Sequence, residues 1–252
     1  MNTLFLLAHH DDEYFSSLLM GMELRSGNHP VVIYLTHGSV YGVASEIRMS
    51  ESLRVLIRMG VNPANIYQLG HAVNIFDQEL PEQIEEAYEH LCRYRSQFMP
   101  IGRVYVMAWE GGHPDHDACH LIGVALAHAM GLQNQLYEFP AYHAVESQLM
   151  ASGVMQFRDG NRNTLTTDST RKDAFRAFCL SLGYPSQWST FLALLPGSAV
   201  QLLLRGQQIY RPVPAGRNYA VPPHEGTLFY EKRFHFSFER FLELTKPFHG
   251  NI

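Results

Sequence analysis

The chain has 252 residues, of which 46% are apolar, 17% are charged and 14 are histidine. This length fits one large α/β domain, and the apolar fraction is sufficient for a continuous core. A formal net charge of −5 provides no overall positive field, which argues against nucleic acid or an anionic membrane as a partner.

The cysteines and the N-terminus indicate where the protein resides. Cys92, Cys119 and Cys179 form no CxxC pair, so we expect reduced thiols in an intracellular protein. The apolar run Leu4–Ala8 has no basic leader and is too short for a signal peptide or a membrane span. We therefore expect a cytoplasmic protein without a membrane-spanning segment.

Short apolar runs and longer amphipathic segments alternate through the first 140 residues. In chain order they predict strand Thr3–Ala8, helix Glu13–Ser26, strand Val31–Leu35, helix Ser45–Met59, strand Ile66–Leu69, helix Pro81–Phe98, strand Val104–Ala108, helix Ala118–Met130 and strand Gln135–Phe139. This alternation predicts an α/β fold with a mostly parallel sheet in a three-layer αβα sandwich.

The pattern is less regular beyond residue 140. It predicts a helix at Thr170–Leu182, a strand at Ala199–Leu204 and a closing helix at Phe236–Thr245, while extended loops are marked by Pro212, Pro214, Pro222 and Pro223. We expect a single domain over residues 1–252. Residues 1–140 would form its catalytic core, and residues 141–252 would shape the substrate site.

Two polar clusters directly follow predicted strands. The first, after the first strand, contains His9, His10, Asp11 and Asp12. The second, after the strand Val104–Ala108, contains His113, Asp115 and His116, with His120 one helical turn further on. Ligands of parallel sheets bind beyond the carboxyl ends of the strands, so we expect both clusters to form one site.

The composition of these clusters is typical of a metal site. Catalytic zinc takes three His, Asp or Glu ligands and keeps one position open for water. The residues alone leave the ligating histidines open: His9 competes with His10, and His116 competes with His120. A single such cluster is more often a solvated turn or a helix cap, but two of them at strand ends favour a metal.

The motifs resemble those of a known family. Ala8-His9-His10-Asp11-Asp12-Glu13 is similar to the Ala-His-Pro-Asp-Asp-Glu motif of the PIG-L / LmbE-like zinc-dependent deacetylases. The segment 112–116 resembles the family's second motif, His-Pro-Asp-His, and the Thr36-His37-Gly38 loop and the Arg48-x-x-Glu51 helix also fit. The resemblance covers residues 1–140 and implies a Rossmann-like fold with the metal at the strand ends.

The resemblance implies a role for each motif residue. The zinc ligands would be His9, Asp12 and His116. Asp11 would be the general base that activates water. His113 would stabilise the oxyanion, and it could also be the acid that protonates the leaving amine. Asp115 would hydrogen-bond His113, keeping it oriented and more readily protonated.

Further candidates would contact the substrate. Arg48 matches a position that binds substrate hydroxyls or phosphate in the family. His37 stands where an acid or amide is common and would alter substrate contacts. Trp109 would line a sugar pocket, or would simply pack in the core. His10 replaces the motif's proline and is expected to be a bystander, because adjacent residues seldom both reach one metal.

The reaction implied by the resemblance is removal of an N-acetyl (acyl) group from an amino sugar or its conjugate, which yields acetate and a free amine. Zn²⁺ is the expected cofactor, although iron(II) or cobalt could occupy the same ligands. The alternatives are a metal-dependent hydrolase of another amide or an ester, and a non-catalytic sugar-binding protein. The expected partner is a small N-acetylated amino sugar, and a homo-oligomer is compatible with the composition.

Overall fold

The computed structural model describes residues 1–38, 44–145, 152–160 and 163–252. Within them, a seven-stranded sheet with the order β3-β2-β1-β4-β5-β9-β8 forms the centre. Its first five strands in this order are parallel, as predicted: β1 (Asn2–Leu7), β2 (His29–Tyr34), β3 (Ile66–Gln68), β4 (Ile101–Met107) and β5 (Leu136–Phe139).

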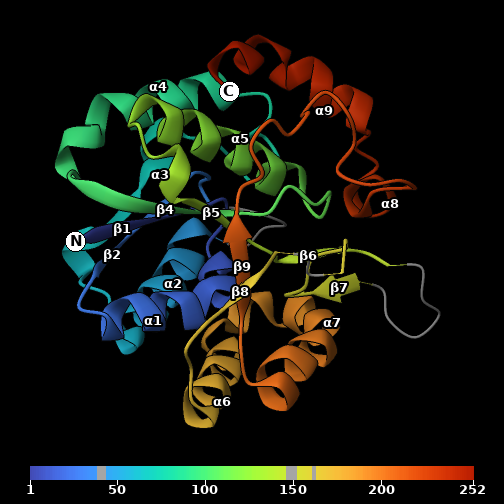
Figure 1. The fold of residues 1–252 in the computed structure, drawn as a ribbon. Helices are drawn as coiled ribbons and strands as arrows, with labels where there is room; N and C mark the ends of the chain where they lie inside the picture. Colours follow the sequence, from blue (N-terminus) through green and yellow to red (C-terminus); the bar gives the residue numbers. More distant parts are fainter. Residues whose placement is uncertain (39–43, 146–151, 161–162) are drawn as a thin grey trace.

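Helices cover both faces of this sheet (Figure 1), which confirms the predicted three-layer αβα sandwich. The lower layer in the figure contains α1 (Ser17–Arg25), α2 (Ser45–Met59), α6 (Arg171–Cys179) and α7 (Trp188–Ala199). The upper layer contains α3 (Leu69–Val73), α4 (Ile84–Tyr94), α5 (Pro114–Ala129) and α9 (Phe238–Thr245), with α8 (Phe229–Phe234) at its edge. No helix in the described ranges is long and apolar enough to cross a membrane.

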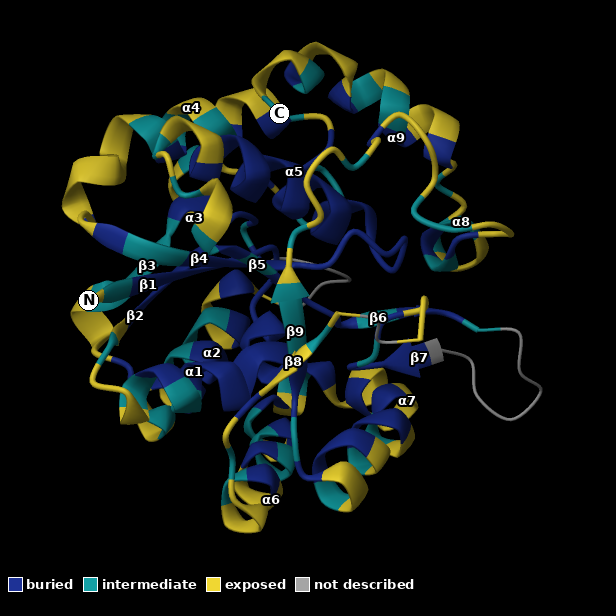
Figure 2. Ribbon diagram, viewed as in Figure 1, coloured by how far each residue is buried: buried dark blue, intermediate teal, exposed yellow. Residues whose placement is uncertain are grey.

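The central strands and α5 are buried (Figure 2). A parallel strand covered by helices on both faces needs apolar side chains on both, which is why these strands appear in the sequence as continuous apolar runs. Gly123 lets α5 approach β4 closely, because a Cβ at this position would lie 2.1 Å from Val106 Cγ1. The close contact packs the middle of α5 directly against β4.

The C-terminal part differs from its prediction. Residues Ala199–Leu204 are not a strand, because α7 continues as a π-helical turn at Val200–Arg205. Periodicity does not distinguish a short apolar strand from a segment of a buried helix. The strand here is β9 (Ile209–Pro212), so Pro212 lies in a strand and not in a loop. β9 pairs antiparallel with β5 and with β8 (Leu165–Thr166).

Other helices also begin or end at residues that differ from the predicted ones. The predicted helix Glu13–Ser26 begins as a 3₁₀ turn at Asp12–Ser16 before α1, and the predicted helix Pro81–Phe98 is α-helical only over α4. A two-stranded ribbon, β6 (Tyr142–Ala144) with β7 (Ser152–Val154), has no counterpart in the prediction. α5 begins at Pro114, so the second polar cluster forms the start of this helix. Proline suits the first helical position because its missing N–H is not needed there.

A buried carboxylate attaches β9 to the parallel part of the sheet. Glu138 of β5 accepts hydrogen bonds from Arg217 Nη1 and Nη2 at 2.6 and 2.7 Å and from Arg211 Nε of β9 at 2.7 Å. Burial by itself would raise the pKa of Glu138, but the hydrogen bonds and charge of Arg217, with the charge of Arg211, hold this pKa below its usual value. The ionised carboxylate therefore ties the C-terminal part of the chain to the core.

We predict that Glu138→Gln lowers the free energy of unfolding by about 3 kcal/mol at pH 7, because two partly buried guanidinium groups lose the charge of Glu138 and, among the described carboxylates, Arg211 keeps only its exposed partner Asp159. A carboxyl group whose pKa is lower in the folded than in the unfolded protein stabilises the fold above the unfolded value, about 4.3. This contribution disappears as the pH falls through the folded value. Urea unfolding should therefore show the variant and the wild type converging below about pH 4.

Glu82→Gln is the matched control, since Glu82 forms an exposed ion pair with Arg240 at 3.3 Å. We expect this substitution to change the free energy of unfolding by less than about 1 kcal/mol. A Glu138→Gln effect that is equally small, or that does not change with pH, would contradict the role given to Glu138.

Candidate functional site

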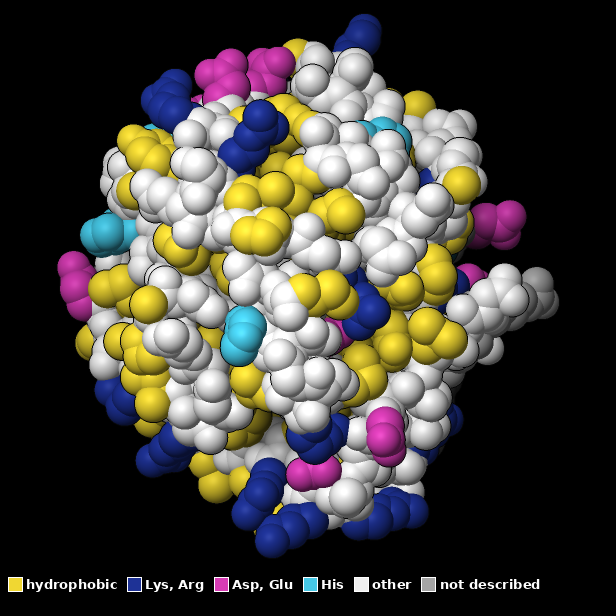
Figure 3. All heavy atoms as spheres, turned by 60° about the vertical axis from the view of Figure 1, so that its left-hand side comes forward, with side chains coloured by type: hydrophobic (Ala, Val, Ile, Leu, Met, Phe, Trp, Pro, Cys, Tyr) yellow, Lys and Arg dark blue, Asp and Glu magenta, His cyan; other side chains and the backbone are white. Residues whose placement is uncertain are grey.

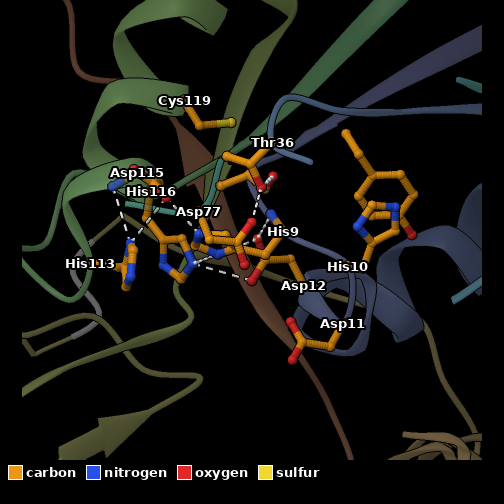
Figure 4. A network of polar contacts seen from close by, with 12 residues as sticks. His9, His10, Asp11, Asp12, Thr36, Asp77, His113, Asp115, His116 and Cys119 are labelled. Carbon is orange, nitrogen blue, oxygen red and sulfur yellow. Dashed lines mark hydrogen bonds and ion pairs between the residues drawn. The ribbon is translucent and has the colours of Figure 1, made fainter. Parts of the chain in front are cut away.

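The two polar clusters meet at the carboxyl ends of β1 and β4, which are neighbours at the centre of the sheet. The sheet grows from β1 through β2 to β3 on one side and through β4 to β5 on the other. This reversal of strand order is where α/β sheets place their ligands. Figure 4 shows side chains from both clusters pointing toward one another there.

Three buried side chains converge on one point. His9 Nδ1 lies 3.2 Å from His116 Nε2 and 3.5 Å from Asp12 Oδ2, and His116 Nε2 lies 3.2 Å from Asp12 Oδ1. The candidate ligand atoms all lie within 4.8 Å of one another. Two imidazole nitrogens that face each other beside a carboxylate form a donor set that fits a divalent cation.

A second group of possible ligands, His9, His113 and Asp115, is already satisfied by the protein. Asp115 Oδ2 accepts hydrogen bonds from the backbone N–H of Gln78 at 2.6 Å and from His9 Nε2 at 2.8 Å, and Oδ1 accepts one from the N–H of Leu80 at 3.2 Å. His113 Nδ1 accepts the backbone N–H of Asp115 at 3.1 Å. These atoms therefore need no cation.

The Asp115 carboxylate orients His9 and not His113. The resemblance predicts a hydrogen bond between Asp115 and His113, but the Asp115 carboxylate lies 3.8 Å from His113 Nδ1 and binds His9 Nε2. This contact leaves His9 Nδ1 facing Asp12 and His116. A carboxylate on the distal ring nitrogen is the usual support of an imidazole that ligates a metal.

His113 is a neutral hydrogen-bond donor in this arrangement. Because its Nδ1 accepts a backbone N–H at the start of α5, the neutral ring carries its proton on Nε2. Burial, followed by the positive charges of His9 and His116, lowers the pKa of His113 well below its usual value. The protonated His113 implied by the motif is therefore not what the structure favours.

Asp11 has an unusual backbone conformation at the rim of the site. Its φ of 111° is a left-handed value that is costly for residues other than glycine. The Asp11 N–H donates to Glu13 Oε2 at 3.0 Å, and the same buried carboxylate accepts hydrogen bonds from the hydroxyls of Tyr34 and Tyr184 at 2.8 and 2.9 Å. Glu13 therefore holds the turn that directs Asp11.

Arg48 and Asp77 lie against Asp11 from the other side. The buried Arg48 guanidinium lies 3.6 Å from Asp11 Oδ1, contacts Asp77 Oδ2 and donates to the backbone carbonyl of His10 at 2.7 Å. Asp77 also accepts a hydrogen bond from Thr36 Oγ1 at 2.6 Å. Burial raises the pKa of Asp11 to about 8, although the charge of Arg48 opposes this rise.

Asp77 is a site residue that the motifs do not predict, and no role was predicted for Glu13. Asp77 lies in the connection between α3 and α4, outside both motifs. The signal that it offered was weak: an acid nine residues beyond the strand β3, with a second acid, Glu79, beside it. Glu13 is part of the first motif, and only the structure shows its contacts.

These groups line a cavity of about 500 Å³. Residues of the two motifs, with Arg48, Asp77 and Gln78, form its polar side. Apart from Phe15, the rest of the lining comes from the C-terminal part: Tyr142, Ser186, Gln187, Ser189, Thr190, Phe191, Ala193, Leu194, Phe229, Arg233 and Phe234. A larger hollow of about 1170 Å³ lies beside Arg217 and Tyr219 and contains none of the metal-ligand candidates.

The two alternative ligand histidines do not line this cavity. His10 stacks on Tyr34 at 4.4 Å between ring centroids, and its Nε2 bonds Gln68 Oε1 at 2.6 Å. Figure 4 shows His10 apart from the cluster. His120 Nδ1 donates to the carbonyl of Met107 at 2.8 Å, and its Nε2 accepts from the Tyr219 hydroxyl at 3.0 Å. Burial lowers the pKa of each ring to about 4, so both are neutral packing residues.

Two of the three substrate-contact candidates also lie elsewhere. Trp109 is 7% exposed and packs at ring-centroid distances of 5.2 and 5.6 Å from Tyr219 and Phe241, which gives it a core role. His37 stacks on His71 at 4.6 Å and is outside the cavity lining. Arg48 does line the cavity, but its guanidinium is engaged by protein carboxylates.

Comparison with known proteins identifies a matching family model and several solved structures with the same fold. Residues 4–127 match the family model described as PIG-L: GlcNAc-PI de-N-acetylase. No curated protein matches the chain. A solved deacetylase triple mutant (Orf2*T) of the teicoplanin biosynthetic pathway is 15% identical, with a TM-score of 0.62 over 86% of this chain and 100% of its own.

Two further solved structures share the fold. N,N'-diacetylchitobiose deacetylase from Pyrococcus horikoshii is 15% identical, with a TM-score of 0.53 over 84% of each chain. GalB, the 4-carboxy-2-hydroxymuconate hydratase from Pseudomonas putida, is 11% identical, with a TM-score of 0.51 over 86% of this chain and 98% of its own. At such identities the likeness concerns the fold alone, and the hydratase shows that this fold also serves another reaction.

We predict that Glu13→Leu lowers the free energy of unfolding by about 3 kcal/mol or more, because a backbone N–H and two tyrosine hydroxyls lose their buried acceptor. Tyr184→Phe, which removes one of these hydrogen bonds, should cost about 1 kcal/mol. Denaturant unfolding of both variants measures these values. Exposed Glu85→Leu on α4 is the control, and a Glu13→Leu variant as stable as this control would show that Glu13 holds nothing in place.

Proposed function

Because residues 4–127 form a PIG-L family domain, we propose that the protein is a zinc-dependent hydrolase that removes an N-acetyl (acyl) group from an amino sugar or its conjugate. The products would be acetate, or the corresponding acid, and a free amine. The observation that carries this proposal is the convergence of His9, Asp12 and His116 beside Asp11 in one cavity.

The metal would be held by His9, Asp12 and His116. Their two nitrogens and one carboxylate match the ligand set of catalytic zinc sites, and iron(II) or cobalt would take the same ligands. When bound, such a cation would polarise the acyl carbonyl and lower the pKa of water. Asp115 supports this role by holding His9 through Nε2 at 2.8 Å, so that Nδ1 faces the other two ligands.

Asp11 would act as the general base. Its carboxylate lines the cavity and is held between Arg48 and the turn fixed by Glu13. It would take a proton from the attacking water and return it to the departing nitrogen. A pKa of about 8 suits both steps near neutral pH, because transfer in each direction then costs little.

His113 would stabilise the oxyanion as a neutral donor. Its Nδ1 is engaged by the Asp115 N–H, so only Nε2–H is available to the carbonyl oxygen as negative charge develops there. A donor fixed by a helix N-terminus needs no rearrangement during the reaction. Asp115 would position both rings, His9 through its carboxylate and His113 through its backbone.

The C-terminal part, residues 141–252, would shape the substrate site within one domain. Its wall combines polar side chains at Ser186, Gln187 and Thr190 with aromatic rings at Phe191 and Phe229. Sugar hydroxyls suit the first set, and an apolar ring face suits the second. Arg48 would act mainly by holding Asp11, because Asp77 already occupies its guanidinium.

We predict that Zn²⁺ stabilises the wild type and not His116→Ala. A ligand that binds only the folded state at 100 times its Kd adds about 2.7 kcal/mol to the free energy of unfolding. Unfolding of metal-stripped protein with and without zinc measures this gain. His128→Ala, an exposed histidine of the same helix, is the control and should keep the full stabilisation. Equal zinc stabilisation of His116→Ala would remove this residue from the metal site.

We predict that Asp11→Asn lowers kcat/KM for release of free amine from N-acetylglucosamine conjugates by about 10²–10⁴-fold, because the general base is lost. Zinc content, measured on the same preparations, should stay at the wild-type level. The exposed Asp168→Asn variant is the control and should keep full activity.

Two outcomes would change the proposal. An Asp11→Asn variant that holds zinc and remains fully active would refute the base role. A wild type that holds zinc, cleaves simple esters or other amides and releases no amine from any N-acetylated amino sugar would move the reaction to another bond.

A further inference from the structure

A ridge of exposed apolar side chains runs along α7 and the π-helical turn that continues it. Every fourth residue from Trp188 onward contributes to this α7 ridge, which consists of Trp188, Leu192, Pro196, Val200 and Leu204. The exposed fractions are 44% for Trp188, 53% for Leu192, 37% for Val200 and 69% for Leu204. An apolar surface continued over so many turns is unusual for a surface that faces only water.

The helix that carries the ridge is uncharged on both sides. No residue from Trp188 to Leu204 is charged. Phe191, Leu194 and Leu202 point into the core, whereas the ridge points outward. A surface helix normally places charged residues on its outer face, so this helix lacks the face that water would solvate.

Cations flank the ridge. Arg205 ends it, and α6, which packs against the π-helical turn, exposes Arg171, Lys172 and Arg176. Between Arg171 and Arg205 the sequence contains one acid, Asp173, which is engaged in the capping box at the start of α6. The α6–α7 surface therefore combines an uncharged apolar ridge with an excess of positive charge.

This local charge is opposite in sign to that of the whole protein. The net charge is −5, but the acids are concentrated elsewhere, for example Glu85, Glu86 and Glu89 on α4. Lys and Arg side chains gather at the lower end of the molecule in Figure 3, where Figure 1 places α6 and α7, while Asp and Glu side chains gather at the top near α4. A net charge alone therefore does not exclude an anionic partner.

We propose that the α6–α7 surface docks onto an anionic lipid surface. The α7 ridge would enter the headgroup region, and Lys172, Arg176 and Arg205 would contact lipid phosphates. Apolar side chains with Trp and Leu beside basic residues, on a helix that does not span, are the features of an interfacial helix. Pairing of two copies through the ridge would bring these cations together, whereas an anionic headgroup layer complements them.

Docking would place the candidate active site next to the lipid. Thr190 and Leu194, from the same helix as the ridge, line the cavity. The docking itself does not depend on the proposed reaction, so it can be tested without substrate.

Co-sedimentation with vesicles tests the proposal. Wild-type protein should bind phosphatidylcholine vesicles that contain phosphatidylglycerol, bind pure phosphatidylcholine far less, and be released by salt. Trp188→Ser combined with Leu192→Ser should weaken binding at least about tenfold. Tyr94→Ser, which removes a 41% exposed ring from α4 in the opposite layer, is the matched control and should bind like the wild type.

A second matched pair of variants tests how much the positive charge contributes to vesicle binding. Arg176→Gln on α6 should weaken binding about fivefold, the effect of one cation near an anionic surface. Arg93→Gln, an exposed cation on α4, should leave binding unchanged. Equal losses in the two variants would mean that only the overall charge matters and would overturn the docking surface.

Tryptophan fluorescence locates the contact. The chain has two tryptophans, of which Trp109 is 7% exposed and Trp188 is 44% exposed. On vesicle binding we expect a blue shift of the emission and quenching by brominated lipid, both arising from Trp188. Thermal melting should show that the variants are folded. If the double variant is not, Leu204→Ser, at the most exposed position of the ridge, replaces it.

Absence of vesicle binding by folded wild-type protein would overturn the proposal. So would binding that the ridge variants leave unchanged. A concentration-dependent dimer in sedimentation velocity, abolished by the double variant and unaffected by vesicles, would instead assign the ridge to pairing of two copies.

Discussion

The parallel pairing of β1 with β4 is the contact on which the site depends. It brings together two loops that are separated by about a hundred residues, because both strands end at the same edge of the sheet. Asp115 then ties this edge together, accepting hydrogen bonds from His9 and from the backbone N–H groups of Gln78 and Leu80. One buried carboxylate thus fixes the loop after β1 and the α3–α4 connection against the start of α5, and the ring nitrogens face one another as a result.

The electrostatics of the site separates two adjacent carboxylates. Burial disfavours ionisation of both Asp11 and Asp12, but the charges and hydrogen bonds of His116 and His9 hold the pKa of Asp12 well below its usual value. The charges of Arg48 and, more weakly, His9 oppose the effect of burial on Asp11, but burial together with the charge of Asp12 prevails, and the pKa of Asp11 rises to about 8. Neighbouring acids with such different environments are suited to different tasks. Asp12 suits a permanently ionised ligand, and Asp11 suits a group that exchanges a proton.

The parallel part of the fold and the motif residues could be predicted because their signals are local. A buried strand is a continuous apolar run, and an acid or imidazole directly after it marks the ligand edge. The remaining site residues have no such signal. Asp77 reaches the site only through the path of the α3–α4 connection, and the choice of His9 over His113 as the partner of Asp115 depends on how α5 begins. The cavity wall from residues 141–252 comes from packing that no spacing encodes.

The failed strand prediction at Ala199–Leu204 and the α7 ridge have the same physical origin. Sequence periodicity identifies a helix when one face is apolar and the other is polar. From Trp188 to Leu204 no side chain is charged, because the inner side packs on the core and the cavity while the outer side is apolar as well. The charged positions that would reveal the helical period are therefore missing, and the last six residues have the pattern of a strand. This helix is nevertheless partly exposed. Because its exposed side carries no charge, that side is suited to a less polar environment than water.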